Sequence, residues 1–373
     1  MPVSSKKPYR VYRQPRRVRG DGTIPWGEVG QTGPGRPGPS TPRRVLRFVR
    51  RAAFVAVALA LVWATIAFLS FRSAVEERND ALPQDVRAAL APADGPALSS
   101  SHVTMLVGAD TSAHRRSTGE EKAGRADTML LMRVDVPSRT VSMLSIPRDL
   151  YVEIPGYGRE RINAAYSNGG LPLAIRTVRK VTGIEVNHVA QIDFDGFKEV
   201  VDALDGVTVQ NPRTFSSSNY FDGGKWYFPK GELHLTGKQA LAYARLRKTR
   251  NVEESTDLAR AARQQRVVDA IVSEVMSAQS IKHPRGVPKA VVQPLLTDIS
   301  ASQMLTFGFG KWWSKPDNSL RCRLGGDQGL GDKGEDVLLP NESNRATVRM
   351  FLGRQAPLAP ESPLSAGCVR SGK

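Results

Sequence analysis

Arginines and aspartates that follow apolar segments are the residues of this sequence best suited to chemistry. The clearest are Asp110, Arg148 and Asp149, which come after strand-like runs, and Arg245 and Arg247, which come much later in the chain. An arginine fork binds two phosphate oxygens at once, and neighbouring carboxylates can hold a divalent cation. The pattern predicts a site that handles phosphate groups.

The candidate metal ligands are two aspartates. Asp110 ends one apolar run and Asp127 opens the next, after the polar loop 111–126. Ligand sites in open α/β sheets gather at the carboxyl ends of strands, so Asp110 and Asp149 would face one crevice if their strands were parallel neighbours. Taken singly, each aspartate also fits a helix cap, a turn or a surface ion pair. The histidines and cysteines have no zinc-ligand spacing, so a metal site must rest on carboxylates.

A second group of polar residues depends on helical geometry. Arg245 and Arg247 are two residues apart, so they would not share a helix face, but they could converge where a helix ends. Arg260 would share a face with Gln264 and with Arg263. A solvated polar helix face is the plain alternative for that second set.

Two common catalytic patterns are missing from the sequence. It has no G-x-x-x-x-G-K-[ST] loop, which argues against a P-loop nucleotidase. It also has no G-x-S-x-G elbow, which argues against an α/β-hydrolase triad. The glycine-rich stretch 325–334 precedes no helical pattern and is interpreted as a loop. Phosphate binding by arginines and carboxylates therefore stands as the leading chemistry.

Alternating strand-like and helix-like segments must position these side chains. Strands are predicted at 103–108, 128–134, 140–146, 187–193 and 206–210, and helices at 171–181, 194–204, 236–246 and 256–278. This alternation indicates an α/β sheet covered on both faces. The last of these helices carries an apolar stripe, which we expect to pack as ordinary core.

The charge-free segment 52–71 is long enough to cross a membrane as a helix. Arginines at 43, 44, 47, 50 and 51 precede it, so the positive-inside rule places the N-terminus in the cytoplasm and the rest of the chain outside. We expect a single-span anchor. A cleaved signal peptide is the weaker alternative, because the apolar stretch is long and follows a long tail.

The N-terminal tail, residues 1–51, carries thirteen basic residues against two acidic ones, which accounts for +11 of the formal net charge of +17. It is also rich in glycine and proline, so we expect it to be disordered. It lacks a helix-turn-helix pattern, and electrostatic attachment to anionic lipid explains its charge equally well. No nucleic-acid partner is expected.

The external part is predicted to have three sections. Residues 72–98 suit a juxtamembrane stalk, 99–356 a folded domain and 357–373 an irregular tail. The cysteines, Cys322 and Cys368, both lie on the external side, where a disulfide could persist. Two unrelated buried thiols are the alternative.

Several of these segments, in this order, resemble the LytR-CpsA-Psr family. They are Val107-Gly-Ala-Asp110, Arg125-Ala-Asp127-Thr-Met, Ser145-Ile-Pro-Arg148-Asp149, Arg161-Ile-Asn-Ala-Ala-Tyr166, Leu204-Asp-Gly-Val207, Leu235-Thr-Gly-Lys-Gln-Ala-Leu241, Tyr243-Ala-Arg245-Leu-Arg247 and Arg263-Gln-Gln265. The resemblance is strong over residues 100–280 and looser as far as 356. It implies one transmembrane helix followed by an external three-layer α/β/α domain with a central mixed sheet.

The resemblance also implies an activity. Such proteins move a glycopolymer from a polyprenyl-pyrophosphate carrier onto a hydroxyl of peptidoglycan or a comparable wall acceptor, leaving a phosphodiester link. The expected cofactor is Mg²⁺, with Mn²⁺ as a possible substitute. The expected partners are the lipid-linked glycan, the peptidoglycan acceptor and the membrane. The polyprenyl tail could also occupy a channel in the protein along helix 256–278.

Roles for individual residues follow from the matched segments. The resemblance implies that Asp110 and Asp127 hold the metal. It implies a catalytic set, which contacts phosphate oxygens or orients the groups that do, and a substrate-binding set. The catalytic set is Arg125, Arg148, Asp149, Arg245 and Arg247, and the substrate-binding set is Arg161, Asn163, Arg260, Arg263 and Gln264. Asp149 either orients an arginine or acts as a base, and Arg161 stands where a lysine is frequent.

Two other functions compete with this one. The first is a polyprenyl-pyrophosphate hydrolase that uses the same metal and arginines with water as the acceptor. The second is a non-enzymatic membrane-anchored regulator. Loops 111–126 and 213–230 are predicted to determine which polymer is bound.

Overall fold

A computed structural model describes residues 41–110, 124–221, 224–251, 253–275, 287–315, 319–359 and 365–370. The chain divides into two compact units, Met1–Ala60 and Leu61–Lys373. Residues 1–40 lie outside the described part, and with them most of the tail that was expected to be disordered. The polar loop 111–126 falls largely on residues 111–123, which also lie outside it.

The first element is the long helix α1 (Thr41–Asp80). Among the described residues, its segment Val45–Asp80 is the one helix that is long and apolar enough to cross a membrane, and an 18-residue stretch of it has a mean hydropathy of 2.5. The predicted apolar span 52–71 lies inside this helix. The helix is longer than predicted because charged residues before Ala52 and after Phe71 also adopt helical structure, so the boundaries of the apolar stretch do not mark the ends of the helix.

The predicted stalk, residues 72–98, is built into the second unit instead of forming a spacer. Val75 in the last turns of α1, Leu82, and Val86 in α2 (Gln84–Ala89) are buried. The Asn79 side-chain amide donates to the carbonyl oxygens of Asp298 and Ile299 at 3.4 and 3.3 Å. Apolar residues spaced among the charged ones thus attach this segment to the folded unit.

In the described part of the chain, seven strands form one mixed sheet in the order β11-β6-β1-β2-β3-β12-β15. Strands β1 and β6 are parallel, as are β3 and β12, and the other neighbouring pairs are antiparallel. The strands are β1 (Ser101–Asp110), β2 (Arg125–Asp135), β3 (Thr140–Ile146), β6 (His188–Asp193), β11 (Leu296–Thr297), β12 (Leu320–Arg323) and β15 (Gly367–Arg370).

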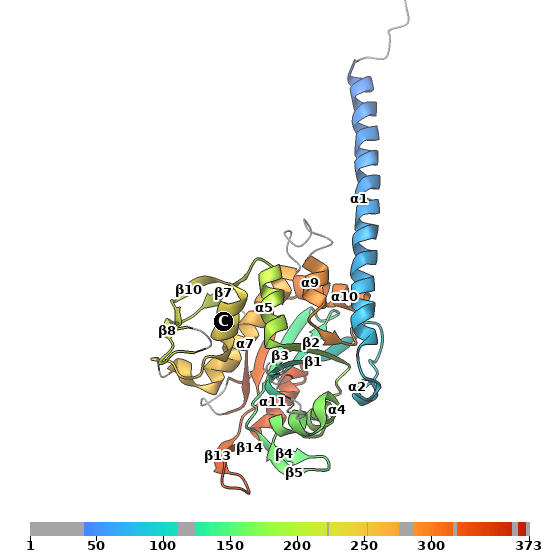
Figure 1. Ribbon diagram of the computed structural model, residues 1–373. Helices are drawn as coiled ribbons and strands as arrows, with labels where there is room; N and C mark the ends of the chain where they lie inside the picture. Colours follow the sequence, from blue (N-terminus) through green and yellow to red (C-terminus); the bar gives the residue numbers. More distant parts are fainter. Residues whose placement is uncertain are drawn as a thin grey trace, which may run out of the picture. The chain divides into compact units, whose positions relative to one another are not determined.

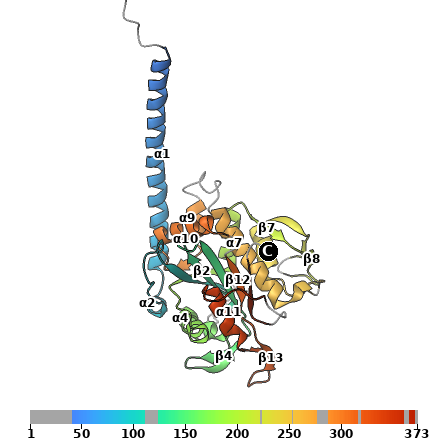
Figure 2. The same cartoon turned by 180° about the vertical axis from the view of Figure 1, so that it is seen from behind.

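Helices cover both faces of this sheet, which confirms the three-layer α/β/α prediction. One face packs against α4 (Asn163–Thr182) and α11 (Ser343–Phe351), the other against α5 (Phe194–Ala203), α7 (Asp257–Val275) and α10 (Ala301–Trp313). Both ribbon views place α10 and α9 (Val287–Val292) on the opposite side of the strands from α4 (Figures 1 and 2).

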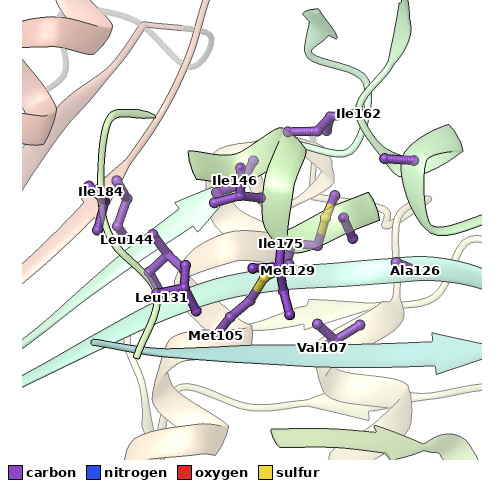
Figure 3. Packing of buried hydrophobic residues seen from close by; sticks show 14 of the residues in the cluster. Met105, Val107, Ala126, Met129, Leu131, Leu144, Ile146, Ile162, Ile175 and Ile184 are labelled. Carbon is purple, nitrogen blue, oxygen red and sulfur yellow. The ribbon is translucent and has the colours of Figure 1, made fainter. Parts of the chain in front are cut away.

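The main core lies between the sheet and α4. Met105, Leu131 and Leu144 point from three neighbouring strands toward Ile175 of α4 (Figure 3). Each of these four side chains is fully buried. Because successive strand residues point to opposite faces, their neighbours along the strands face the other helical layer. This second face contributes to the functional site described below.

Smaller two-stranded sheets flank the central one. The predicted strand 206–210 is β7 (Val207–Asn211), which pairs with β10 (Gly231–Leu235) outside the central sheet. The others are the pairs β4 (Tyr151–Ile154) with β5 (Gly158–Arg161), β8 (Phe215–Ser216) with β9 (Tyr227–Phe228), and β13 (Asp327–Leu330) with β14 (Asp336–Leu339). The stretch 325–334, interpreted above as a loop, therefore contains a strand.

The C-terminal segment was expected to be irregular, and this expectation was wrong for residues 367–370. They form β15, which pairs with β12 at an edge of the central sheet. Cys322 and Cys368 lie opposite each other in this pair and are joined by a disulfide, with a Cα–Cα distance of 4.0 Å. The disulfide prediction is confirmed, and it explains how a short strand without a long apolar pattern stays on the sheet.

Candidate functional site

A pocket of about 470 Å³ lies near the ends of β1 and β2, where several of the predicted site residues meet. Seven of them line it: Asp110, Asp127, Arg148, Arg245, Arg247, Arg260 and Gln264. Asp110 ends β1, and Arg148 follows β3. The two strands run in the same direction but are separated by the antiparallel β2, so they are not neighbours, although their ends still reach one pocket.

A β-bulge aims two consecutive residues of β2 into this pocket. The register between β1 and β2 shifts so that Thr128 pairs with Gly108 and Ala126 pairs with Ala109, which leaves Asp127 as the extra residue. Ala126 belongs to the core on the opposite face, whereas Asp127 and Thr128 both line the pocket. A regular strand would send Asp127 and Thr128 to opposite faces, so the bulge is what allows both to contribute.

Asp127 lies between two arginines. One of its carboxylate oxygens is 3.6 Å from Arg148 Nη1 and the other is 3.8 Å from Arg245 Nη2. The Arg245 guanidinium also stacks over the ring of Phe194, 3.8 Å from its centroid. These contacts hold both guanidinium groups at the pocket wall, where they present donors to an anion.

Arg245 and Arg247 converge because helix α6 (Gly237–Arg245) ends between them. Leu246 has an extended backbone, with φ −59° and ψ 125°, so the chain leaves helical geometry after Arg245. Both arginines consequently line the pocket, as does Lys248. The expectation that they could converge where a helix ends is confirmed.

The arginines of this pocket raise its positive potential. Burial, followed by the nearby charges of Arg260 and Arg148, lowers the pKa of Arg247 to about 10. Burial also lowers the pKa of Arg260, an effect that its ion pair with Asp257, 2.7 Å away, partly offsets. Clustered cations whose charged forms are destabilised gain most from a bound anion.

Helix α7 contributes Arg260 and Gln264 from one face, as their spacing predicted. The Gln264 side-chain amide donates to Thr128 Oγ1 at 3.0 Å, which connects α7 to the bulged part of β2. This hydrogen bond positions the Gln264 and Thr128 side chains at the pocket wall.

Arg263, expected among the substrate-binding residues, is not brought to the pocket. Its side chain is fully buried, and it donates to the carbonyl oxygens of Tyr243, Glu254 and Leu246. It also forms an ion pair with Glu254 at 2.9 Å. The helical turn between Arg260 and Arg263 directs the second arginine into the core formed by α6, α7 and β7, so its observed contacts are structural.

Asp149, Arg161 and Asn163 lie behind Arg148 and do not line the pocket. The Asp149 carboxylate is 3.4 Å from Arg148 Nε and 3.9 Å from Arg161 Nε. The backbone N–H of Asn163 donates to the Arg148 carbonyl oxygen at 3.3 Å. This geometry favours an orienting role for Asp149 over a role as a base. Arg125 begins β2 opposite Asp110, and its side chain lies outside the described part of the structure.

An apolar cavity of about 320 Å³ adjoins the polar pocket, with Thr128, Arg245 and Gln264 in both walls. It lies between the central sheet and helices α5, α7 and α10. The stripe on α7 that was expected to form ordinary core contributes five of its lining residues. These are Val267, Val268, Ile271, Val272 and Val275. The expectation of ordinary core holds in part, because Val267 is buried in a core cluster against which Ile271 and Val275 also pack. A periodic pattern shows which face turns inward but not whether that face is completely filled.

Two carboxylates, Asp110 and Asp127, are the metal-ligand candidates that line the pocket. No group of three or more His, Cys, Asp or Glu residues suited to a metal ion occurs within the described ranges. A metal here would therefore depend on water or substrate oxygens for its remaining ligands, which is how Mg²⁺ is commonly bound beside phosphates.

Sequence reasoning missed several residues of the pocket wall. They are Asn219, Tyr220, Phe221 and Lys248. The first three belong to the loop 213–230, which was predicted to determine the bound polymer, but no local signal identified these residues. Lys248 could have been found, because it directly continues the basic run that follows α6.

Comparisons with known proteins agree with this geometry. A family model described as the LytR_cpsA_psr family matches residues 66–317. A curated relative from Bacillus subtilis, "Polyisoprenyl-teichoic acid--peptidoglycan teichoic acid transferase TagV", is 32% identical over 245 residues, covering 64% of this chain and 62% of the relative. The match thus spans about three fifths of that relative's length.

Solved structures give the same result. The chain is similar to the crystal structure of B. subtilis TagV, with 28% identity, a TM-score of 0.55, and coverage of 68% of this chain and 98% of that one. It is also similar to "LytR-CPS2A-psr family protein YwtF (TagT) with bound octaprenyl pyrophosphate lipid", with 25% identity, a TM-score of 0.51, and coverage of 70% and 93%.

Proposed function

Because this chain belongs to the LytR-CpsA-Psr family, we propose that it transfers a glycopolymer from a polyprenyl-pyrophosphate carrier to a wall acceptor. The acceptor is a hydroxyl of peptidoglycan or of a comparable polymer, and the product is a phosphodiester. Support comes from relatives named as transferases between polyisoprenyl-linked teichoic acid and peptidoglycan, and from a similar structure described with octaprenyl pyrophosphate.

One observation carries the proposal: an arginine-rich pocket and an apolar cavity share three wall residues, Thr128, Arg245 and Gln264. The ligand that fits this arrangement has a multiply charged head joined directly to an apolar tail. A lipid pyrophosphate has both parts. A free nucleotide or inorganic phosphate would leave the cavity without an occupant.

In the proposed reaction, the acceptor oxygen attacks the phosphorus that bears the sugar. The bond from that phosphorus to the bridging oxygen breaks, polyprenyl phosphate leaves, and the hydroxyl proton passes to a base or to solvent. Arg148, Arg245 and Arg247 bind the phosphate oxygens and stabilise the negative charge of the transition state. Asp149 acts on Arg148 as a positioning residue.

The proposed cofactor is Mg²⁺, with Mn²⁺ as a substitute, held by Asp110 and Asp127. Their paired carboxylates fit the preference of these ions for oxygen ligands. When bound, the ion would neutralise part of the pyrophosphate charge.

The proposed location is the cell membrane, with the N-terminus in the cytoplasm and the pocket outside. The arginines before the apolar segment support this orientation. Nucleotides are scarce outside the cytoplasm, which also favours a lipid-linked substrate.

The decisive experiment incubates the full chain in detergent with Mg²⁺, a lipid-pyrophosphate oligosaccharide and peptidoglycan fragments. A phosphodiester product joined to the fragments supports transfer. Release of the oligosaccharide phosphate without such a product would instead support the hydrolase alternative, and no reaction at all would contradict both.

A variant that fills the cavity tests the tail site separately. Val272→Trp should abolish turnover of a long-chain polyprenyl substrate while retaining that of a short-chain analogue, because only the long tail needs the cavity. Val272→Ala is the matched control and should accept both. Equal loss with both substrates in the Trp variant would argue against a tail site here.

A further inference from the structure

Helix α10 has an exposed apolar face that the proposed reaction does not use. Leu305, Phe309 and Trp312, spaced four and three residues apart, are 45%, 41% and 69% exposed, and Trp313 is 42% exposed. This spacing puts the first three on one side of the helix. Folded proteins rarely expose a group of large apolar side chains on one face, and such patches mark contact with a membrane or another protein.

The aromatic side chains form a cluster at the C-terminal end of α10. The ring of Phe309 is 6.0 Å from that of Trp312 and 5.9 Å from that of Trp313. The Arg139 guanidinium stacks over Trp313 at 4.2 Å, and Lys315 follows with an exposed side chain. Tryptophan beside basic residues is typical of the interface between lipid headgroups and acyl chains.

The start of α10 contacts the end of the candidate membrane span. Phe71, the last residue of the charge-free segment, and Val75 pack in one cluster with Ala301 and Met304 of α10. Arg72 follows at once and begins the charged region. A membrane crossed by the charge-free segment must therefore have its surface close to Phe71, and so close to α10.

We propose that the face of α10 formed by Leu305, Phe309, Trp312 and Trp313 binds the surface of the membrane that α1 crosses. The helix has thirteen residues and extends about 20 Å. In the proposed placement it lies along the headgroup region, near the end of the charge-free segment at Phe71. Its aromatic rings enter the boundary between headgroups and acyl chains, while Arg139 and Lys315 contact anionic headgroups. This proposal depends on the membrane span and not on the proposed reaction.

The opposite face of α10 explains why such binding is useful. Met304, Phe307 and Gly308 line the apolar cavity. One helix therefore separates the cavity from the proposed membrane surface. If the proposed function holds, a lipid tail passes from bilayer to cavity along α10 without crossing open water.

The test measures how close α10 lies to lipid. The two cysteines of the sequence are joined in a disulfide, so one introduced thiol can be labelled alone. A fluorophore is placed at Lys315→Cys in the full chain, reconstituted in phosphatidylcholine vesicles containing phosphatidylglycerol. A lipid with a nitroxide near its headgroup quenches a fluorophore at the surface. The matched control carries the fluorophore at Tyr157→Cys, an exposed position between β4 and β5.

We expect quenching at position 315 to exceed that at position 157 several-fold. Adding Phe309→Ser and Trp312→Ser should reduce quenching at 315 at least two-fold, whereas adding Tyr227→Ser and Leu330→Ser, at exposed positions away from α10, should leave it unchanged. The substituted side chains are exposed, so the fold should persist. Equal weak quenching at both positions would overturn the proposal. So would a fluorophore at 315 that is shielded from aqueous iodide yet unaffected by the nitroxide lipid, because a protein would then cover this face.

Discussion

At the scale of single residues, arginines in one segment of α7 have opposite roles. Arg260 lines the polar pocket, whereas Arg263, three positions later, is fully buried among carbonyl oxygens. Their residue type and spacing could not distinguish these roles, because residues three positions apart are expected on the same face of a helix. Their difference lies in what the neighbouring elements offer: a cavity on one side, and the end of α6 with Glu254 on the other.

Replacing Arg148 tests the pocket. Arg148→Ala should reduce transfer at least about 100-fold, because it removes a guanidinium that faces the proposed pyrophosphate. The measurement is the initial rate of phosphodiester formation, with circular dichroism as the check on folding. Arg159→Ala is the matched control, since Arg159 is an exposed arginine of the nearby strand β5. A folded Arg148→Ala protein with full activity would refute the assignment.

Replacing Arg263 should affect folding. Arg263→Met should lower the free energy of unfolding by about 3–5 kcal/mol, because it leaves the buried Glu254 carboxylate without its partner. Urea denaturation of the full chain in detergent measures this. Adding Glu254→Gln to Arg263→Met removes the unpaired charge and should recover part of the lost free energy of unfolding. An Arg263→Met protein of normal stability that fails to bind substrate would restore the original expectation for this residue.

At the scale of elements, the sequence predicted the regular parts well. Strand β3 has its predicted bounds, and α5 and α6 begin and end within a residue of theirs. The periodicity of apolar residues defines these elements because it reflects which face is buried. The bulge in β2 and the edge strand β15 could not be predicted, since they depend on pairing with distant strands.

The same limit applies to the site. The ends of β1 and β3 were identifiable because polar residues directly follow apolar runs. The loop that carries Asn219 and Tyr220 was predicted to determine specificity, but nothing local in its sequence indicates which of its residues line the pocket. Site residues could therefore be predicted where they directly follow a strand, but not where they lie on a loop.

A buried histidine pair joins several elements and should make stability depend on pH. His102 Nδ1 lies 3.0 Å from His188 Nε2, and His188 Nδ1 lies 2.7 Å from Asp298. Burial, followed by the charge of His188, lowers the pKa of His102 below 6.5, while Asp94 opposes this. Below pH 6.5 the unfolded chain therefore binds a proton that the folded chain resists.

Stability from His102 is thus fully present above pH 6.5 and is lost as the pH falls through the lowered folded-state pKa. The loss is at most about 1.4 kcal/mol per pH unit in that interval. Urea denaturation at pH 7.5 and 5.0 should show a smaller difference in His102→Gln than in the parent chain. An identical difference in both proteins would exclude His102 as the cause.

At the scale of the whole molecule, the segment after the apolar span belongs to the folded unit. Val75, Leu82 and Val86 pack into it, although their segment precedes the first strand of the sheet. The family match also begins before them, at residue 66. The folded unit is therefore longer than the domain 99–356 predicted from sequence.

A truncated chain that starts at Ser99 should be strongly destabilised. Losing three buried aliphatic side chains costs on the order of 5 kcal/mol, which is comparable to the total stability of many domains. The measurement is the urea midpoint of this chain against one that starts at Leu61, which retains the packed segment. Equal midpoints would show that the segment adds nothing to the fold.

The three wall residues common to pocket and cavity, Thr128, Arg245 and Gln264, have a consequence for inhibition. A single amphiphile with an anionic head and an apolar tail can occupy both spaces and lose its translational freedom once. Its two halves then behave as the arms of a chelate, each raising the effective concentration of the other. Shortening the tail or neutralising the head should weaken such a compound far more than either fragment's own affinity suggests.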